Sequence, residues 1–123
     1  MLEHVNVTVR DPMVTAKRFA ELFGWKIRWQ GEAIDNGYSV HVGTDDHYIA
    51  FYAPAGHVVD SGDTYTTEGG LNHIGVVVDD LDAVAAKVTA LGYALHSFGA
   101  YEPGRRFYFD DADNIEVEVV SYR

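Results

Sequence analysis

A repeated segment constrains the fold of this 123-residue chain more than any other feature. Residues 2–11 and residues 71–80 match at one constant offset, 73 − 4 = 69. The aligned pairs are Leu2 with Leu71, His4 with His73, and Asp11 with Asp80. A period of this length indicates that one supersecondary unit occurs twice, so the fold must be built from two copies of it.

An amphipathic helix is predicted after each repeated segment. Apolar residues recur at helical spacing between Asp11 and Gly24, and again between Asp80 and Gly92. Aspartate is a favoured N-cap, and glycine is favoured just past the C-terminal end, where a left-handed backbone is needed. We therefore predict one helix between each aspartate and its glycine.

Three short runs rich in aromatic and β-branched residues follow each helix and predict strands. They are residues 25–30, 38–42 and 48–52 in the first copy, and residues 93–98, 106–109 and 115–120 in the second. The predicted class is α+β, with two βαβββ modules. We expect a single domain made of repeats 1–54 and 70–123, joined by a linker over residues 55–69. A linker of this length is typical of a mobile segment or of one that covers a site.

Alternation along the predicted strands places three polar side chains on the faces that do not pack under a helix. In the first strand, His4 lies opposite the apolar residues Val5 and Val7, and His73 has the equivalent position in the second copy. In the last strand, Glu118 likewise lies opposite the apolar set. Taken singly, each histidine is typical of a structural or solvent-exposed residue, whereas their paired placement indicates a shared function.

Composition narrows the possible partners and chemistry. The formal net charge of −10 disfavours nucleic acid and anionic membrane surfaces as partners, while leaving a small molecule possible. The chain has no cysteine, which excludes thiolate metal sites and cysteine nucleophiles and fits a reducing compartment. We find no signal peptide or membrane-spanning stretch in the sequence and expect a cytoplasmic protein.

Two segments give the chain a resemblance to a known superfamily. The opening, Leu-Glu-His4-Val-Asn-Val-Thr-Val-Arg-Asp, leads into a helix that ends in Leu-Phe-Gly-Trp. The closing segment runs Arg106-Phe-Tyr-Phe-Asp-Asp-Ala-Asp-Asn-Ile-Glu-Val-Glu118-Val. Together they resemble the glyoxalase, bleomycin-resistance and extradiol-dioxygenase (vicinal oxygen chelate) superfamily over essentially the whole chain. The resemblance implies a curved, cup-like mixed sheet with helices on the outside.

The resemblance also implies a metal site. Metal-binding members take one ligand from the first strand and one from the last strand of each module, which carries over to His4, His73 and Glu118. The fourth position is Ala50, and a register slip would substitute Tyr48 or Tyr52, neither a carboxylate. Two imidazoles and one carboxylate suit Fe, Mn, Ni, Co or Zn. Ala50 makes a lactoylglutathione lyase activity doubtful, because the residue cannot transfer a proton.

Further candidate residues concern the substrate. Tyr48, Tyr52 and Tyr101 are candidate catalytic residues that could act as a base in the cup. Arg105 and Arg106 could hold a substrate carboxylate in a bidentate fork, with Tyr101 and Phe107 beside it. The alternative for the two arginines is a solvated strand edge.

We thus expect a divalent-metal-dependent enzyme, of lyase, isomerase, transferase or dioxygenase type, that acts on a small substrate with vicinal oxygens. The main alternative is a metal-free protein that sequesters a drug-like or aromatic ligand, and a third is a domain whose cup is empty and which binds another protein. The resemblance implies a homodimer. Whether His4 meets His73 of its own chain or of a second copy stays open at this stage.

Overall fold

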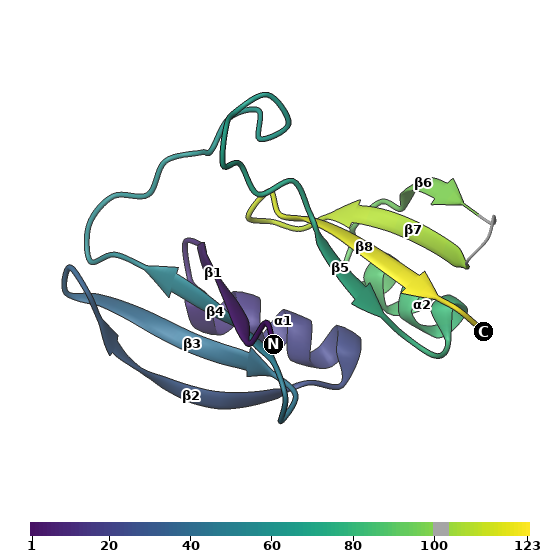
Figure 1. Ribbon diagram of the computed structural model, residues 1–123, viewed down its shortest axis with the longest axis horizontal. Coiled ribbons are helices and arrows are strands. Elements are labelled where there is room, and N and C mark those ends of the chain that lie inside the picture. The colour runs from purple at the N-terminus through teal and green to yellow at the C-terminus, as the bar shows by residue number, and fades with distance from the viewer. Residues whose placement is uncertain (100–103) are drawn as a thin grey trace. The chain divides into compact units, whose positions relative to one another are not determined.

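The structure is a computed structural model that describes residues 1–99 and 104–123 (Figure 1). The chain divides into two compact units, Met1–Val59 and Asp60–Arg123, which are described separately. The elements of unit 1 are β1 (His4–Thr8), α1 (Pro12–Phe23), β2 (Lys26–Ala33), β3 (Gly37–Gly43) and β4 (Tyr48–Ala53). The described elements of unit 2 are β5 (Ile74–Val77), α2 (Leu81–Ala90), β6 (His96–Gly99), β7 (Arg105–Asp110) and β8 (Glu116–Ser121).

Each unit contains one four-stranded mixed sheet with the same connectivity. The strand order is β1-β4-β3-β2 in unit 1 and β5-β8-β7-β6 in unit 2. The first and last strands of each unit pair in parallel, and the other neighbours pair antiparallel. The predicted α+β class and the two βαβββ modules are confirmed.

The helix ends follow the predicted caps. Asp11 Oδ1 accepts a hydrogen bond from the Val14 amide at 3.2 Å, and Pro12 starts α1. Gly24 ends α1 with a left-handed backbone, φ 69°. Asp80 caps α2 in the same way as Asp11 caps α1, and the predicted glycine, Gly92, takes φ 92° just beyond the helix.

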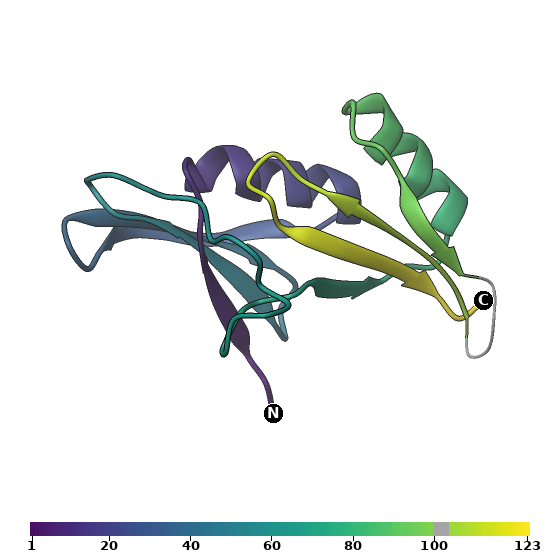
Figure 2. The same cartoon turned by 90° about the horizontal axis from the view of Figure 1, so that it is seen from above.

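One face of each sheet is covered by the helix of its own unit, as Figure 2 shows. The core of unit 1 contains Val9, Phe19, Leu22, Val40, Val42 and Phe51, each at most 2% exposed. The core of unit 2 contains Val88, Phe107, Phe109, Val117 and Val119. In β1, the exposed His4, Asn6 and Thr8 alternate with the half-buried Val5 and Val7, so the predicted polar face of β1 is confirmed.

The strand predicted over residues 93–98 starts late, because β6 begins at His96. The amide of Tyr93 still bonds to the carbonyl of Val88 in the turn that closes α2, at 3.3 Å. Ser97 has φ 55°, and the pairing of β6 with β7 shifts register at this point. The strand therefore begins after the turn that closes α2 and carries a local bulge between His96 and Gly99.

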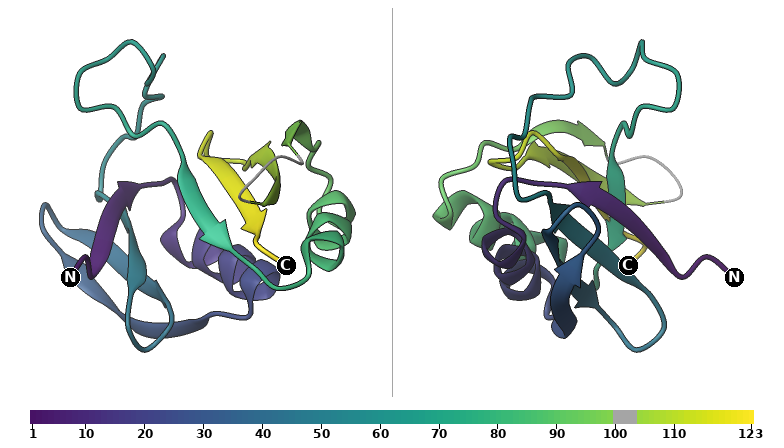
Figure 3. Two further views of the ribbon diagram at one scale, coloured as in Figure 1. Left: turned by 45° about the vertical axis from the view of Figure 1, so that its right-hand side comes forward. Right: turned by 90° about the vertical axis from the view of Figure 1, so that its left-hand side faces the viewer.

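The segment between the two sheets, residues 54–73, contains no helix or strand and is visible in both views of Figure 3. His73 is its last residue and immediately precedes β5, whereas His4 is the first residue of β1. Within the described parts of the chain, neither helix has the length and hydropathy that a membrane crossing requires.

Candidate functional site

In unit 2 the structure brings together two of the predicted metal ligands. Nε2 of His73 lies 3.4 Å from Oε2 of Glu118, the residue that pairs with Gly75 across β5 and β8. The side chain of His73 is 36% exposed and that of Glu118 only 14%. A carboxylate is thus held at the open face of the sheet, next to an imidazole that solvent can reach.

Two side chains of β7 hold this carboxylate in place. Nη1 of Arg106 donates to Oε1 of Glu118 at 3.3 Å, and the side chain of Arg106 is 15% exposed. The hydroxyl of Tyr108, which pairs directly with Glu118 across the strands, donates to Oε2. Charge-assisted bonds of this kind fix the orientation of a half-buried carboxylate.

A tyrosine of the segment between the sheets reaches the same face. The hydroxyl of Tyr65 donates to Oε1 of Glu116 at 3.0 Å and lies 3.4 Å from Nδ1 of His73. The pKa of Tyr65 is raised, first because its surroundings remove hydration and then because Glu116, Asp110 and Glu118 place negative charge around it. The hydroxyl therefore keeps its proton at neutral pH.

Both ring nitrogens of His73 lie near oxygen atoms. Nδ1 is 3.4 Å from the hydroxyl of Tyr65, and Nε2 is 3.4 Å from Oε2 of Glu118. With a proton on Nε2, the ring donates toward the carboxylate. With the proton on Nδ1, the lone pair of Nε2 faces the carboxylate, an arrangement that a cation bound by both atoms would stabilise.

This pair of atoms fits a metal ion. Two donors that each lie about 2.1 Å from one tetrahedral divalent cation are about 3.4 Å apart, the separation that Nε2 and Oε2 have here. A nitrogen and a carboxylate oxygen are also the donor types that such ions bind. Among the residues that the structure describes, no three His, Cys, Asp or Glu side chains form a complete ligand set.

His4, the third predicted ligand, belongs to a row of four rings in unit 1. The ring of Tyr48 stacks with that of His4 at a centroid distance of 4.8 Å and with that of His41 at 4.5 Å. Trp29 continues the row at 4.9 Å from His41. Each ring comes from a different strand, in the order in which the strands pair, so the row crosses the whole sheet.

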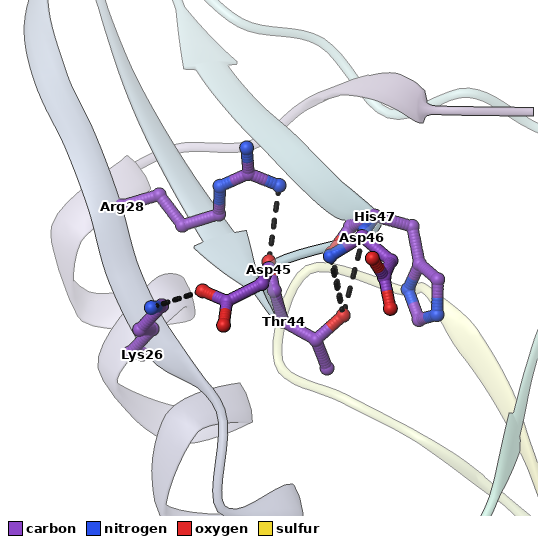
Figure 4. A network of polar contacts seen from close by, with 6 residues as sticks. All are labelled: Lys26, Arg28, Thr44, Asp45, Asp46 and His47. Carbon is purple, nitrogen blue, oxygen red and sulfur yellow. Dashed lines mark hydrogen bonds and ion pairs between the residues drawn. The ribbon is translucent and has the colours of Figure 1, made fainter.

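An arginine lies over this row. The guanidinium carbon of Arg28 is 4.5 Å from the centroid of the Tyr48 ring, a cation–π distance. Arg28 is held by a hydrogen bond to the carbonyl of Thr44 at 3.0 Å, while Lys26 pairs with Asp45 on the same turn (Figure 4). The pKa of His41 is lowered, first by burial and then by the positive charges of His4 and Arg28.

Ala50 occupies the position in unit 1 that Glu118 occupies in unit 2. It pairs with Asn6 of β1 and with His41 of β3, as Glu118 pairs with Gly75 and Tyr108. Ala50 is 2% exposed, and no carboxylate stands in its place.

The predicted substrate residues lie in two places. Tyr48 carries the stacked rings of unit 1, and the hydroxyl of Tyr52 donates to the carbonyl of Ile34 at 3.0 Å. A hollow of about 310 Å³ lies between α2 and the β6–β7 edge, and Arg105, Arg106 and Phe107 are among the residues that line it. Its other lining residues are Leu81, Asp82, Ala85, Phe98 and Gly99. Arg105 pairs there with Asp82 at 3.0 Å. Tyr101 lies outside the described residues.

Sequence reasoning missed several residues of these faces. Tyr108 and His41 could have been found by pairing the predicted strands, because they are the cross-strand partners of Glu118 and Ala50. Tyr65 carries no such signal, since it lies in a segment without regular structure.

The comparison with protein families assigns the chain to a superfamily. A model of the glyoxalase/bleomycin resistance protein/dioxygenase superfamily matches residues 3–109. The chain therefore belongs to this superfamily, as its opening and closing segments predicted. No curated protein matches it.

Solved structures agree in fold. The glyoxylase/bleomycin resistance protein/dioxygenase domain from Frankia sp. EAN1pec is 26% identical, with a TM-score of 0.83 over 100% of this chain and 98% of that one. The fosfomycin resistance protein FosX from Listeria monocytogenes, solved with Mn(II) and sulfate, is 17% identical, with a TM-score of 0.71 over 98% and 91% of the two chains. FosX from Mesorhizobium loti is 22% identical, with a TM-score of 0.69 over 98% and 90%.

Proposed function

We propose that this protein is a divalent-metal-dependent enzyme that acts on a small substrate through two neighbouring oxygen atoms, with His4, His73 and Glu118 as metal ligands. The approach of His73 Nε2 to Glu118 Oε2 at 3.4 Å carries the proposal, because this is about the separation of two ligand atoms bound to one tetrahedral divalent cation. His4 is the third ligand by its equivalent strand position, from the same chain or from a second copy in a homodimer.

A bound Fe, Mn, Co, Ni or Zn ion would supply Lewis-acid chemistry by polarising the substrate oxygens. The Mn(II) bound in Listeria FosX supports this choice of ion class, since FosX shares the fold. With only three ligands offered by the chain, positions remain for the two oxygens of a substrate.

The residues around Glu118 would keep that carboxylate ready to bind. Arg106 donates to Oε1, and Tyr108 donates to Oε2, the oxygen that also faces His73, so both side chains orient the carboxylate. Tyr48, Tyr52 and Tyr101 remain the candidate bases, and among these Tyr52 uses its hydroxyl proton toward Ile34. Arg105, Arg106 and Phe107 remain candidate substrate residues, on the support of the hollow that they line.

Ala50 argues against a lactoylglutathione lyase activity. A small apolar side chain at the position equivalent to Glu118 can neither bind a metal nor move a proton. The reaction classes to test first are therefore those of the transferase and dioxygenase types, on a substrate with vicinal oxygens.

Metal analysis tests the proposal directly. Protein purified without chelators and without a metal-binding tag should contain near-stoichiometric metal, or take it up from Fe(II), Mn(II), Ni(II), Co(II) or Zn(II). His73→Ala and Glu118→Ala should lose it, while His57→Ala, at an exposed histidine between the sheets, should keep it. Metal-free protein after loading with all five ions would refute the proposal; metal-loaded protein would be screened with diols, α-keto hemithioacetals and acyl-CoA esters.

The row of rings in unit 1 favours a second candidate function, the sequestration of an aromatic ligand without metal. Four rings from four strands present a polarisable surface on which a planar molecule could stack, and Trp29 in the row is 49% exposed. Chelator-treated protein should then bind a planar ligand stoichiometrically, quench the fluorescence of Trp29 and form no product. Trp29→Phe would remove the signal, and an unchanged signal would refute this candidate.

A further inference from the structure

We propose that the hollow between α2 and the β6–β7 edge is a second binding site, which takes a small zwitterion with an apolar side chain, the chemistry of an apolar α-amino acid. Arg105 binds the carboxylate of this ligand and Asp82 binds its ammonium group, while the apolar side chain fills the hollow. The site works without a metal ion.

Alternation along β7 places the hollow on the helix-covered face of the sheet. Arg106 donates to Glu118 on the open face. Arg105 and Phe107, its neighbours along the strand, point to the opposite face, and Arg105 pairs there with Asp82 of α2 at 3.0 Å. The sheet itself thus separates a ligand in the hollow from the carboxylate of Glu118. Of the candidate substrate residues, Arg105 and Phe107 belong to the hollow and Arg106 to the open face.

The walls of the hollow suit an apolar group. Leu81 and Ala85 line it from α2, and Phe98 and Phe107 line it from the two strands. Leu81 and Phe107 are buried, whereas Phe98 is 71% exposed although its ring is large and apolar. A ligand that covers Phe98 removes apolar surface from water, which favours binding. The volume of about 310 Å³ is at the lower end of the range for small-molecule sites, so it suits a ligand the size of one amino acid.

The rim of the hollow carries one charged group of each sign. Nη2 of Arg105 contacts Oδ1 of Asp82. A guanidinium has five N–H donors and a carboxylate has two oxygens, so the pair can also bind the carboxylate and the ammonium group of a ligand. Both side chains are more than half exposed and can turn toward a ligand at little cost.

The charges near the start of α2 exclude a simpler ligand. Asp79 and Asp80 precede the helix and Asp82 lies in its first turn. Three carboxylates in this short segment would repel a ligand that has only negative charge. A zwitterion gives each charge at the rim an opposite partner, so it is favoured over a plain carboxylate.

Equilibrium dialysis and proton–nitrogen NMR of the chelator-treated protein test the proposal with L-phenylalanine and L-leucine as probes. Both should bind saturably in the millimolar range and shift the amide signals of Ala85, Phe98 and Gly99. Three analogues each lack one part of the ligand: 2-phenylethylamine the carboxylate, 3-phenylpropanoate the ammonium group, and glycine the side chain. Each should bind about 10-fold more weakly than L-phenylalanine, or worse.

Two variants change the site in different ways. Arg105→Ala removes the partner of the carboxylate, and Ala85→Leu fills the hollow, so each should weaken binding of L-phenylalanine about 10-fold or more. Arg123→Ala is the matched control, because Arg123 forms an exposed ion pair with Asp79 at 3.1 Å. Arg123→Ala and His73→Ala should leave the dissociation constant unchanged. Circular dichroism checks that Ala85→Leu is folded, and Arg105→Ala, at an exposed position, tests the site independently.

Any of four results would overturn the inference. They are a lack of saturable binding in the millimolar range, binding that Arg105→Ala leaves unchanged, binding that Arg123→Ala weakens equally, and 3-phenylpropanoate that binds as tightly as L-phenylalanine. The protein is free of metal throughout, so these results stay distinguishable from a failure of the proposed metal site.

Discussion

Two adjacent arginines give a direct test of how burial controls an ion pair in unit 2. Arg106 pairs with Glu118 at 3.3 Å, and the two side chains are 15% and 14% exposed. Arg105 pairs with Asp82 at a similar 3.0 Å, but these side chains are 54% and 80% exposed. The two ion pairs are nearly matched in residue type and in distance, so the solvent exposure of their side chains is the main difference between them.

The expected energies follow from that difference. At 3.3 Å and an effective dielectric constant of about 20, the attraction between Arg106 and Glu118 is about 5 kcal/mol before desolvation. Desolvation of both groups offsets about half of it, so the expected coupling free energy is about 2–3 kcal/mol. The pair of Arg105 with Asp82 is screened by water and should contribute no more than about 1 kcal/mol.

Double-mutant cycles with alanine at each pair, read by urea unfolding of the metal-free protein, measure these couplings. The cycle removes the separate costs of losing the contacts of Glu118 with Tyr108 and His73, since those costs occur in the single variant as well. Couplings that agree within about 0.5 kcal/mol, or a larger value for Arg105 and Asp82, would refute the reasoning.

Three further changes test other parts of the fold. The pKa of His41 lies below its ordinary value of 6.5 in the folded state, so the unfolded chain binds the proton more readily. The free energy of unfolding should therefore fall as the pH drops below about 6.5. In thermal unfolding, His41→Gln should flatten this pH dependence, and His57→Gln should not. Asp111 is 5% exposed and its Oδ1 accepts from two backbone amides, so Asp111→Ala should cost about 2–3 kcal/mol in urea unfolding and Asp111→Asn less; equal losses would contradict this. Gly43→Ala would place a Cβ 2.3 Å from the carbonyl oxygen of His47 and should cost about 2 kcal/mol, whereas Gly56→Ala, with open space around it, should be nearly neutral.

The sequence predicts the fold well because the fold depends on local and periodic signals. Asp11 and Asp80 cap their helices, and the alternation along β1 and β8 separates core from open face as expected. The main departures are the late start of β6 at His96 and the left-handed backbone of Ser97 within that strand, which the residue types do not predict. The strand propensity of a serine does not indicate that its φ will be positive, which is uncommon for a residue other than glycine.

The turn before β8 places an asparagine in the left-handed region, with φ 60° at Asn114. Asparagine is among the residues that tolerate this region best. The side chain of Asp111 closes the turn by accepting from the amide of Ile115, next to the start of β8.

The site is less predictable, because its contacts cross between strands and come from an irregular segment. The equivalence of His4 and His73 follows from the repeat, and Glu118 follows from alternation. The approach of Tyr65 to His73 depends on the path of the turn over residues 63–70, which Asp63 and Gly70 fix by contacts that no periodic pattern encodes.

The pairing of strands shows how two copies of one unit have diverged in chemistry. Positions that pair alike hold Ala50 and Glu118, His41 and Tyr108, and Trp29 and His96. In unit 1, His41 and Trp29 belong to the row of rings under Arg28, and in unit 2, Tyr108 donates to the carboxylate of Glu118. Because these strand pairings are the same in both units, the difference in chemistry comes from the side chains at these positions. For the proposed metal site, a single carboxylate at Glu118, with none at Ala50, would favour an ion that keeps open positions for a substrate, since a structural metal site needs a full set of protein ligands.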